Sequence, residues 1–467
     1  MKLKKLEIRN FRCFESLALE LDEQLTVLVA RNGQGKTAVL DAVRIGLWAF
    51  VRGFDLARNP GNEGGNNISI DDVRMVKIPD GRMLRQLPCV VTLQGNFDLG
   101  VINNEDGKKL WTWSRRRISE AKTTKTKDNA PSLLIWRLAT DAQNQVRNPE
   151  SPDMDLPVIA YYGTGRVWSQ KRLMENKKAK GKQDVSFYMR LFGYRDCLDS
   201  SSSFRHFADW FIWIFECYWE DKINKSEIGS SFETNLVWSN IIQVIQQVTN
   251  SVLHETGWHT LGYSVNSGEK SLVLKHDQYG ALNIELLSDG IRNVLGIIGD
   301  IAYRCIKLNP HLGLNAAKES RGVVMIDEID MHLHPEWQQT ILGNLCKAFP
   351  KIQFIVTTHS PQVISTVPDH QIRILDGNQV YSAEAGTQGA ESSRILKRIF
   401  GVDPRPQNDP NTKLLNDYLD LVYADKWDNA KTMRERLDAI YQGNEPALTE
   451  ADLYIENRQW ELDVEKN

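Results

Sequence analysis

A glycine-rich turn between an apolar run and a helical pattern is the feature that most limits how this chain can fold. Residues 25–29 are mainly apolar, and the turn from Ala30 to Thr37 reads Ala-Arg-Asn-Gly-Gln-Gly-Lys-Thr. It fits the phosphate-binding pattern G-x-x-x-x-G-K-[ST], with alanine replacing the first glycine. Apolar residues then recur at helical spacing, at Val39, Leu40 and Val43. The order of strand, glycine turn and helix predicts a P-loop within an α/β fold.

The chemistry expected of this turn is binding of ATP with Mg²⁺. Backbone N–H groups at a helix start point toward bound anions, the lysine reaches the β and γ phosphates, and the hydroxyl holds magnesium. The residues expected to bind nucleotide are Asn32, Gly33, Gln34, Gly35, Lys36 and Thr37, with Thr37 also a magnesium ligand. Alanine tolerates positive φ less well than glycine, so Ala30 affects the expected loop geometry more than the expected binding. The alternative is a glycine turn without a ligand.

A second motif supplies the carboxylates that nucleotide hydrolysis requires. Residues 323–326 are apolar and are followed by Asp327 and Glu328. A strand ending in two acids lets Asp327 bind Mg²⁺ through water and lets Glu328 polarise the attacking water. The alternative is a buried strand that ends in a surface acidic pair. The P-loop favours the catalytic interpretation, because each motif requires the other.

A third motif, Leu-Ser-Asp-Gly at residues 287–290, is predicted to begin a helix. Ser288 is an N-cap residue type, and a helix start with a hydroxyl and free N–H groups can bind a γ-phosphate together with Gly290. Taken alone, the motif could equally be an ordinary cap. Its place between the other two motifs, about forty residues before Asp327, favours the phosphate-binding role.

The rest of the chain alternates strand and helix patterns, which predicts a largely parallel core sheet. We expect four regions: a first lobe with a mixed sheet (1–113), an insertion containing a central strand and an aromatic-rich helical segment (114–256), a second lobe (257–375) and a helical C-terminal extension (376–467). The strand at residues 156–162 leads into a glycine turn that would bring Arg166 to the sheet's edge. In the extension, Leu396, Ile399 and Phe400 are predicted to share one helical face.

Composition excludes several classes but identifies no partner. Of the 467 residues, 41% are hydrophobic and 25% charged, and the net charge is -3, which is typical of a soluble globular protein. Six scattered cysteines show no zinc spacing, no segment is apolar for the length of a membrane span, and the N-terminus lacks a secretory signal, so a cytoplasmic protein is expected. Two segments rich in basic residues, 114–128 and 171–182, are either solvated loops or contacts with nucleic acid.

With these motifs the chain resembles the ABC ATPases, and most closely the heads of SMC, RecF and OLD-like proteins, over residues 1 to about 370. The resemblance implies a nucleotide site completed by Ser288 and Gly290 of a second subunit, and hence a homodimer or higher oligomer. It also implies that Arg12 approaches the phosphates, that Asp330 is the D-loop aspartate, and that His359 is the catalytic switch histidine beside Glu328. Gln94 is a candidate Q-loop residue, although a solvated strand position is equally compatible. The long helical arms of SMC proteins are not expected.

Three segments narrow the resemblance to the ATPases of prokaryotic anti-phage systems, of the Septu PtuA family, which also occurs in retrons. They are residues 156–166, 286–292 and 395–406. In that family a separate HNH nuclease works with the ATPase, and nucleic acid is reached through the complex. No clustered acidic triad follows His359 and no H-N-H pattern occurs, so we expect no nuclease site in this chain. The alternative function is a RecF- or SMC-like repair ATPase that binds DNA without a nuclease.

Overall fold

The computed structural model describes two compact units of the chain, residues 1–395 and 396–467. The residues described are 1–58, 63–97, 110–121, 124–165, 188–199, 203–228, 236–266 and 269–466. The predicted position of Arg166 and the basic segment 171–182 lie outside the described residues. No helix among the described residues is long and apolar enough to cross a lipid bilayer.

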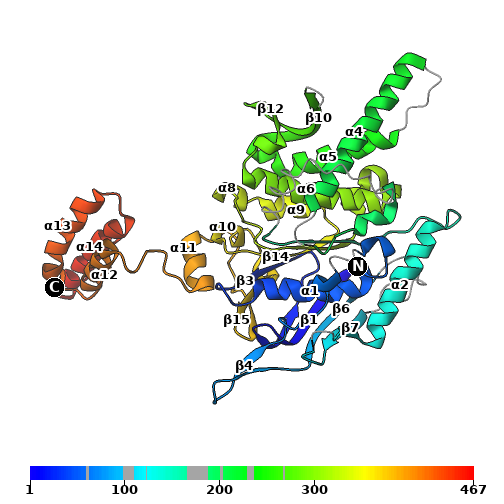
Figure 1. Cartoon of the computed structure of the whole chain (residues 1–467). Helices are drawn as coiled ribbons and strands as arrows, with labels where there is room; N and C mark the ends of the chain where they lie inside the picture. Colours follow the sequence, from blue (N-terminus) through cyan, green and yellow to red (C-terminus); the bar gives the residue numbers. More distant parts are fainter. Residues whose placement is uncertain are drawn as a thin grey trace. The chain divides into compact units, whose positions relative to one another are not determined.

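The centre of the first unit is a six-stranded sheet in the order β16-β15-β3-β14-β13-β9 (Figure 1). Its strands are β3 (Leu25–Val29), β9 (Val158–Tyr162), β13 (Gly322–Ile326), β14 (Ile352–Thr357), β15 (Ile372–Asp376) and β16 (Gln379–Ser382). All neighbouring strands are parallel except β15 and β16. Every residue of β3, β9, β13 and β14 is buried, as expected for parallel strands covered on both faces. The predicted α/β fold with a mainly parallel core is therefore confirmed.

A second, five-stranded sheet is antiparallel throughout, in the order β2-β1-β6-β7-β8. Its strands are β1 (Lys2–Phe11), β2 (Phe14–Glu20), β6 (Cys89–Asn96), β7 (Leu110–Arg117) and β8 (Lys127–Asp128). In β6 every second residue is buried, so one face of the sheet packs inward. Helix α1 (Lys36–Val51) covers that face, and Trp113 of β7 donates a hydrogen bond to the carbonyl of Gly46 in α1. The five-stranded sheet of the first lobe is thus antiparallel and not mixed as predicted. The mixed sheet is the six-stranded one, because its pair β15–β16 is antiparallel.

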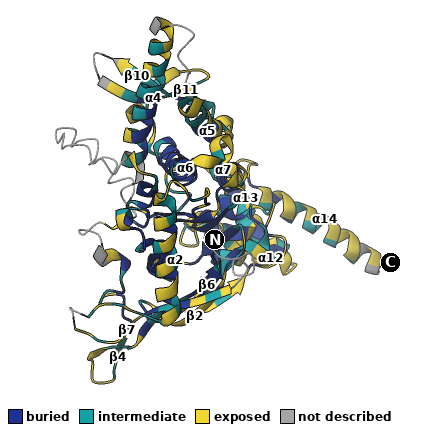
Figure 2. Cartoon of the chain, turned by 90° about the vertical axis from the view of Figure 1, so that its right-hand side faces the viewer, coloured by how far each residue is buried: buried dark blue, intermediate teal, exposed yellow. Residues whose placement is uncertain are grey.

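Helices also cover the face of the six-stranded sheet that lies away from α1 (Figure 1). The long ones are α4 (Ser203–Ile228), α5 (Leu236–Leu253) and α6 (Asp289–Leu308), and α6 is almost wholly buried (Figure 2). A buried network fixes α6 to the sheet: Asp300 accepts hydrogen bonds from Tyr162 of β9 (2.7 Å) and from Arg304 (2.7 Å). A buried charge is tolerated where it is paired and hydrogen-bonded in this way. The sheet β10-β11-β12 (Trp258–Asn266, Glu269–His276, Gly280–Asn283) packs beside α4 and α5.

The remaining elements of the first unit are short or peripheral. They are α2 (Ala130–Arg147), α7 (Ala316–Glu319), α8 (Pro335–Gln338), α9 (Ile341–Ala348), α10 (Pro361–Ile364), α11 (Ser392–Ile395) and the hairpin β4 (Met75–Lys77) with β5 (Met83–Arg85). Helix α2 begins where the side chain of Asn129 accepts the N–H of Ser132, and its apolar stripe packs on α1.

The second unit is a small helical bundle with its own core. It contains α12 (Pro410–Tyr423), α13 (Trp427–Tyr441) and α14 (Pro446–Lys466), whose buried residues form one cluster that includes Leu415, Tyr418 and Leu437. Residues Leu396–Phe400, predicted to form one α-helical face, are a π-helix, and Phe400 is buried. The three residues therefore do not share the predicted α-helical face, because a π-helix bonds i to i+5 and breaks the 3.6-residue spacing on which that prediction depended.

Candidate nucleotide-binding site

The glycine turn joins β3 to α1 in the geometry of a phosphate-binding loop. Gly33 has φ of 82° and Gly35, the N-cap of α1, has φ of 92°, in the left-handed region that favours glycine. A Cβ on Gly35 would come within 2.5 Å of the Phe14 ring, so the position also has no room for a side chain. The first N–H groups of a helix lack partners within the helix and form a site for an anion, so the start of α1 suits phosphate binding.

Lys36 begins α1 and folds back over its own loop. Its Nζ donates to the carbonyl of Ala30 (3.1 Å) and lies 2.5 Å from Nε2 of His359, which leaves β14 at the neighbouring strand end. Burial lowers the pKa of Lys36, although the carboxylates of Asp327 and Glu328 oppose that shift. The sheet therefore brings the predicted lysine and the predicted histidine together.

Thr37 and Asp327 meet at the same strand ends. The hydroxyl of Thr37 donates to Oδ2 of Asp327 (2.8 Å), and the hydroxyl of Thr357 donates to Oδ1 (2.6 Å). Asp327 is only 1% exposed. A hydroxyl and a carboxylate oxygen in contact are the hard oxygen donors that Mg²⁺ prefers, so these residues fit a magnesium ion.

Glu328 is half-buried and directly follows Asp327, with its backbone in the left-handed region at φ of 49°. That conformation costs a non-glycine residue roughly 1–2 kcal/mol, and surrounding contacts must hold it. Two residues later, Asp330 accepts a hydrogen bond from the hydroxyl of Thr358 (2.6 Å). Asp327 and Asp330 are thus both anchored to threonines at the end of β14.

Ser288 and Gly290 lie at the start of α6, where the structure gives them local roles. The Ser288 hydroxyl accepts the N–H of Ile291 (3.4 Å), which is the capping alternative considered for this motif. A Cβ on Gly290 would lie 2.4 Å from the carbonyl oxygen of His332, so glycine allows α6 to approach the turn after β13. Both contacts belong to the local structure around the start of α6.

Three other predicted residues have partners away from this cluster. Arg12 forms ion pairs with Asp41 of α1 (2.7 Å) and with Asp72 (2.9 Å). Gln94, the Q-loop candidate, lies on β6 and donates to the hydroxyl of Thr112 (3.2 Å), as a solvated strand residue would. Gln34 accepts the backbone N–H of Gly377 (3.1 Å), and Asn32 is exposed on the loop.

Sequence reasoning missed Thr357, which bonds to both predicted acids of the second motif. Its hydroxyl accepts the N–H of Glu328 (2.8 Å) while donating to Asp327. The signal was present in the sequence: two threonines follow the apolar run at residues 354–356, just before His359. A polar residue at that buried strand end requires a partner.

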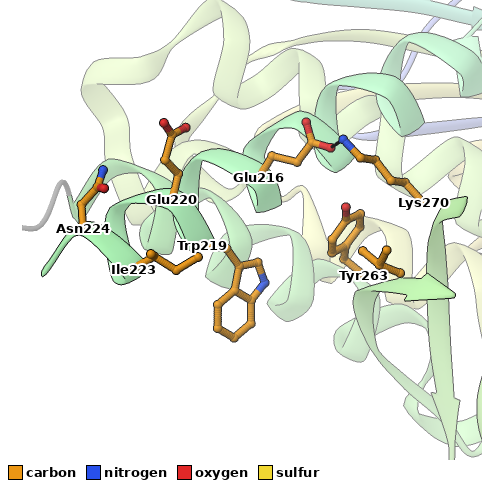
Figure 3. Close-up of a pocket in the computed structure, with 8 residues that line it drawn as sticks. Glu216, Trp219, Glu220, Ile223, Asn224, Tyr263 and Lys270 are labelled. Carbon is orange, nitrogen blue, oxygen red and sulfur yellow. Dashed lines mark hydrogen bonds and ion pairs between the residues drawn. The ribbon is translucent and has the colours of Figure 1, made fainter. Parts of the chain in front are cut away.

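A second concavity lies on other elements, between the outer part of α4 and the strands β10 and β11 (Figure 3). It encloses about 670 Å³ and is lined by Glu216, Trp219, Glu220, Ile223, Asn224, Tyr263, Val265 and Lys270. An ion pair between Lys270 and Glu216 bridges it. Trp219, Ile223 and Val265 are each about half exposed, at 49%, 52% and 54%. This groove contains no P-loop residue and no part of the nucleotide chemistry.

Comparison with known proteins identifies the family to which the chain belongs. The family model "AAA domain" matches residues 5–246, more than half of the chain, and a second AAA-domain model matches residues 221–365. The chain therefore belongs to the AAA-domain family of ATPases. Three relatives place it within that class. The "Retron Ec83 probable ATPase" of Escherichia coli is 27% identical over 100% of this chain and 89% of the relative.

The other two relatives match with higher identity over less of their own length. "Septu protein PtuA" of Bacillus mycoides is 40% identical over 21% of this chain and 13% of the relative. "OLD nuclease" of Thermus scotoductus is 35% identical over 77% of this chain and 59% of the relative. The protein is thus an ATPase of the SMC, RecF and OLD group, related to the retron and PtuA ATPases, and the predicted resemblance is confirmed.

Proposed function

We propose that this chain is the ATP-hydrolysing regulatory subunit of a prokaryotic anti-phage complex, and that it controls a separate HNH-type nuclease in the cytoplasm. The observation that carries the hydrolytic part is the convergence of Lys36, Thr37 and Asp327 beyond the carboxyl ends of β3 and β13, the two strands that flank β14, with Glu328 directly after Asp327. Parallel strands bring their carboxyl ends to one edge of the sheet, where ligands bind in α/β folds.

Each residue has a proposed task in ATP hydrolysis. The backbone from Asn32 to Thr37 binds phosphate oxygens, and Lys36 neutralises their charge. Thr37 and Asp327 would hold Mg²⁺, which supplies charge neutralisation at the phosphates. Glu328 orients the attacking water and accepts its proton, and His359 hydrogen-bonds the terminal phosphate. We also assign Arg12 and Asp330 to the nucleotide site. For Arg12 to reach a phosphate, its ion pair with Asp41 must open.

We propose that a second copy of the chain completes the site through Ser288 and Gly290. The serine caps its own helix by one weak bond of 3.4 Å, so its hydroxyl retains capacity for a phosphate oxygen. Two heads that face each other would each contribute an α6 start to the other's P-loop. Dimerisation would then follow ATP binding, because the phosphate is the ligand that both heads share.

The defence role and the nuclease partner rest on the relatives. Two of them bear the names of a retron ATPase and of Septu protein PtuA, and the first spans the whole of this chain. Co-expression of the chain with the gene next to its own tests this. Recovery of a small HNH protein in a stable complex supports the proposal, and an ATPase that purifies alone and protects no cells from phage contradicts it.

The alternative, a DNA-binding ATPase without a nuclease, is favoured by one row of basic residues. On the outer face of the antiparallel sheet, Arg9 pairs with Val90, Val90 with Arg116, and Arg116 with Lys127. The three basic side chains are exposed, so they point away from α1 toward solvent. By contrast, Arg115 and Arg117 of the same basic segment are buried and serve the fold.

Replacement of these three exposed residues by glutamine tests the alternative. If they bind DNA, the slope of log affinity against log salt concentration should become shallower by about 0.9 for each phosphate that they neutralise. An unchanged slope would mean that the row does not bind the phosphate backbone.

A further inference from the structure

Thr357 occupies the strand end that lies between the P-loop strand and the strand of the catalytic acids. It is the last residue of β14, which pairs with β3 on one side and β13 on the other. The residue is 0% exposed. Its hydroxyl, which has one proton and can accept two bonds, donates to Oδ1 of Asp327 (2.6 Å) and accepts the N–H of Glu328 (2.8 Å).

The backbone of Thr357 adds a third bond to the same segment. Its carbonyl accepts the N–H of Ile329 (3.0 Å). One residue of β14 therefore holds three consecutive residues as the chain leaves β13. The regular pairing of β13 with β14 ends at Ile326. Beyond that residue, the three bonds to Thr357 take the place of the hydrogen bonds between the strands.

This arrangement fixes the direction of the Asp327 carboxylate. With Oδ1 engaged by Thr357, the other oxygen, Oδ2, faces the hydroxyl of Thr37 at 2.8 Å. Removing the bond to Oδ1 would let the carboxylate turn about its terminal torsion, which is a broad, soft rotor. The bond to the N–H of Glu328 supports a residue whose backbone is in the left-handed region.

We propose that Thr357 is a positioning residue of the nucleotide site: its hydroxyl turns Asp327 toward Thr37 and holds the backbone that presents Glu328. The inference rests on the proposed assignment of Thr37 and Asp327 to magnesium. Thr357 acts through those residues and does not itself touch the nucleotide. The hydroxyl is the group that positions Asp327 and Glu328. Thr357→Val tests it, because valine has nearly the same shape and carries a methyl group in place of the hydroxyl.

The test compares Thr357→Val with Thr357→Ser in the full-length protein. Binding of a fluorescent ATP analogue is measured with Mg²⁺ and with EDTA, and the Mg²⁺ concentration for half-maximal ATPase activity is determined. Thr357→Val should weaken Mg²⁺-dependent affinity and raise that concentration by about tenfold, since it removes a hydrogen bond to a charged group. Affinity in EDTA should stay unchanged. Thr357→Ser, which keeps the hydroxyl, should stay within about twofold of the unmodified protein.

A matched control separates positioning from stability. Thr26 of β3 is also 0% exposed, and its hydroxyl accepts a backbone N–H, that of Asp22 (2.9 Å). Thr26→Val removes a buried hydroxyl from the same sheet and should leave the Mg²⁺ dependence unchanged. If Thr357→Val does not fold, Thr357→Cys takes its place, because a thiol is a weak donor.

Two outcomes overturn different statements. If Thr357→Val lowers the unfolding temperature as Thr26→Val does but keeps the Mg²⁺ dependence of the unmodified protein, the residue is structural and the inference is wrong. If the unmodified protein itself neither binds nor hydrolyses ATP in an Mg²⁺-dependent way, the proposed function fails before Thr357 is tested.

Discussion

Nζ of Lys36 and Nε2 of His359 are 2.5 Å apart, although 323 residues separate them in the chain. A protonated lysine can only donate, so Nε2 must accept and the proton of the neutral ring lies on Nδ1. Burial lowers the pKa of His359, and the charge of Lys36 lowers it further, which favours this neutral form. The histidine thus faces the place where the lysine would meet a phosphate.

Replacing His359 by alanine should separate binding from hydrolysis. The lysine keeps its bond to the carbonyl of Ala30, so ATP affinity should change by less than about threefold. The hydrolysis rate should fall by about 10²-fold, the lower range for loss of a positioned polar group in the transition state. Equilibrium binding and single-turnover hydrolysis measure the two effects. Loss of affinity as large as the loss of rate would show that the histidine serves the loop's structure.

Lys36 and Ser288 should fail at different steps. Lys36→Ala removes the charge that the phosphates require and should abolish detectable ATP binding. Ser288→Ala removes a cap and the proposed bond across the dimer, so it should keep ATP binding and impair closure or hydrolysis. Isothermal titration with each variant tests this. Equal loss of ATP binding in both would contradict the assignment of Ser288 to the second subunit.

Glu328→Gln should trap a closed dimer in the presence of ATP and Mg²⁺. The amide keeps the size of the side chain but cannot accept the proton of the attacking water, so ATP stays bound and unhydrolysed. Light scattering should report a larger mass with ATP than without. A constitutive oligomer would require a distance probe between the two α6 starts instead. The composite site would be wrong if neither method detected a nucleotide-dependent change in this variant.

The sequence indicated which residues of the candidate site lie together better than it indicated the packing around them, for physical reasons. Phosphate binding constrains a short contiguous loop, so residues 30–37 could be recognised without the fold. Ser288 was ambiguous because helix capping and anion binding use the same residue types. The partners of Asp41 and Asp300 could not be inferred, since those pairs depend on how elements distant in sequence pack together. Residues 114–128 showed in the sequence only that they are rich in basic residues, yet strand alternation buries Arg115 and exposes Arg116.

Lys307 should make stability rise with pH. Burial lowers its pKa to about 8 in the folded chain, well below the value of about 10.4 in an unfolded one. Between these values the unfolded state binds more protons, so the folded state gains stability as the pH rises. Lys307→Met, which keeps the apolar stem, should raise the free energy of unfolding at pH 7 by up to about 3 kcal/mol. The unfolding temperature should rise with it. Its advantage should shrink toward pH 10. A constant difference from pH 7 to pH 10 would contradict this.

The C-terminal unit should be where the partner protein docks. Residues 396–467 form a compact unit with its own core, and every residue assigned above to the nucleotide site lies outside it. Three apolar residues on α14, Leu453, Trp460 and Val464, are exposed by 56%, 70% and 56%. Their spacing of seven and four puts them on one helical face. Because the charged residues of α14 are mainly acidic, we expect a partner surface that is apolar and basic.

Ending the chain after Ile395 should therefore abolish recovery of the co-expressed nuclease while ATP binding and self-association persist. In the full-length chain, Trp460→Asp should have the same effect, because a charge on that face opposes apolar contact. Tyr279→Asp is the matched control, since Tyr279 is 66% exposed on a turn of the first unit. An unfolded or ATP-blind truncated chain would show that the ATPase core needs this unit. Full recovery of the nuclease would move the interface to the groove at Trp219 and Ile223, where the same substitution strategy applies.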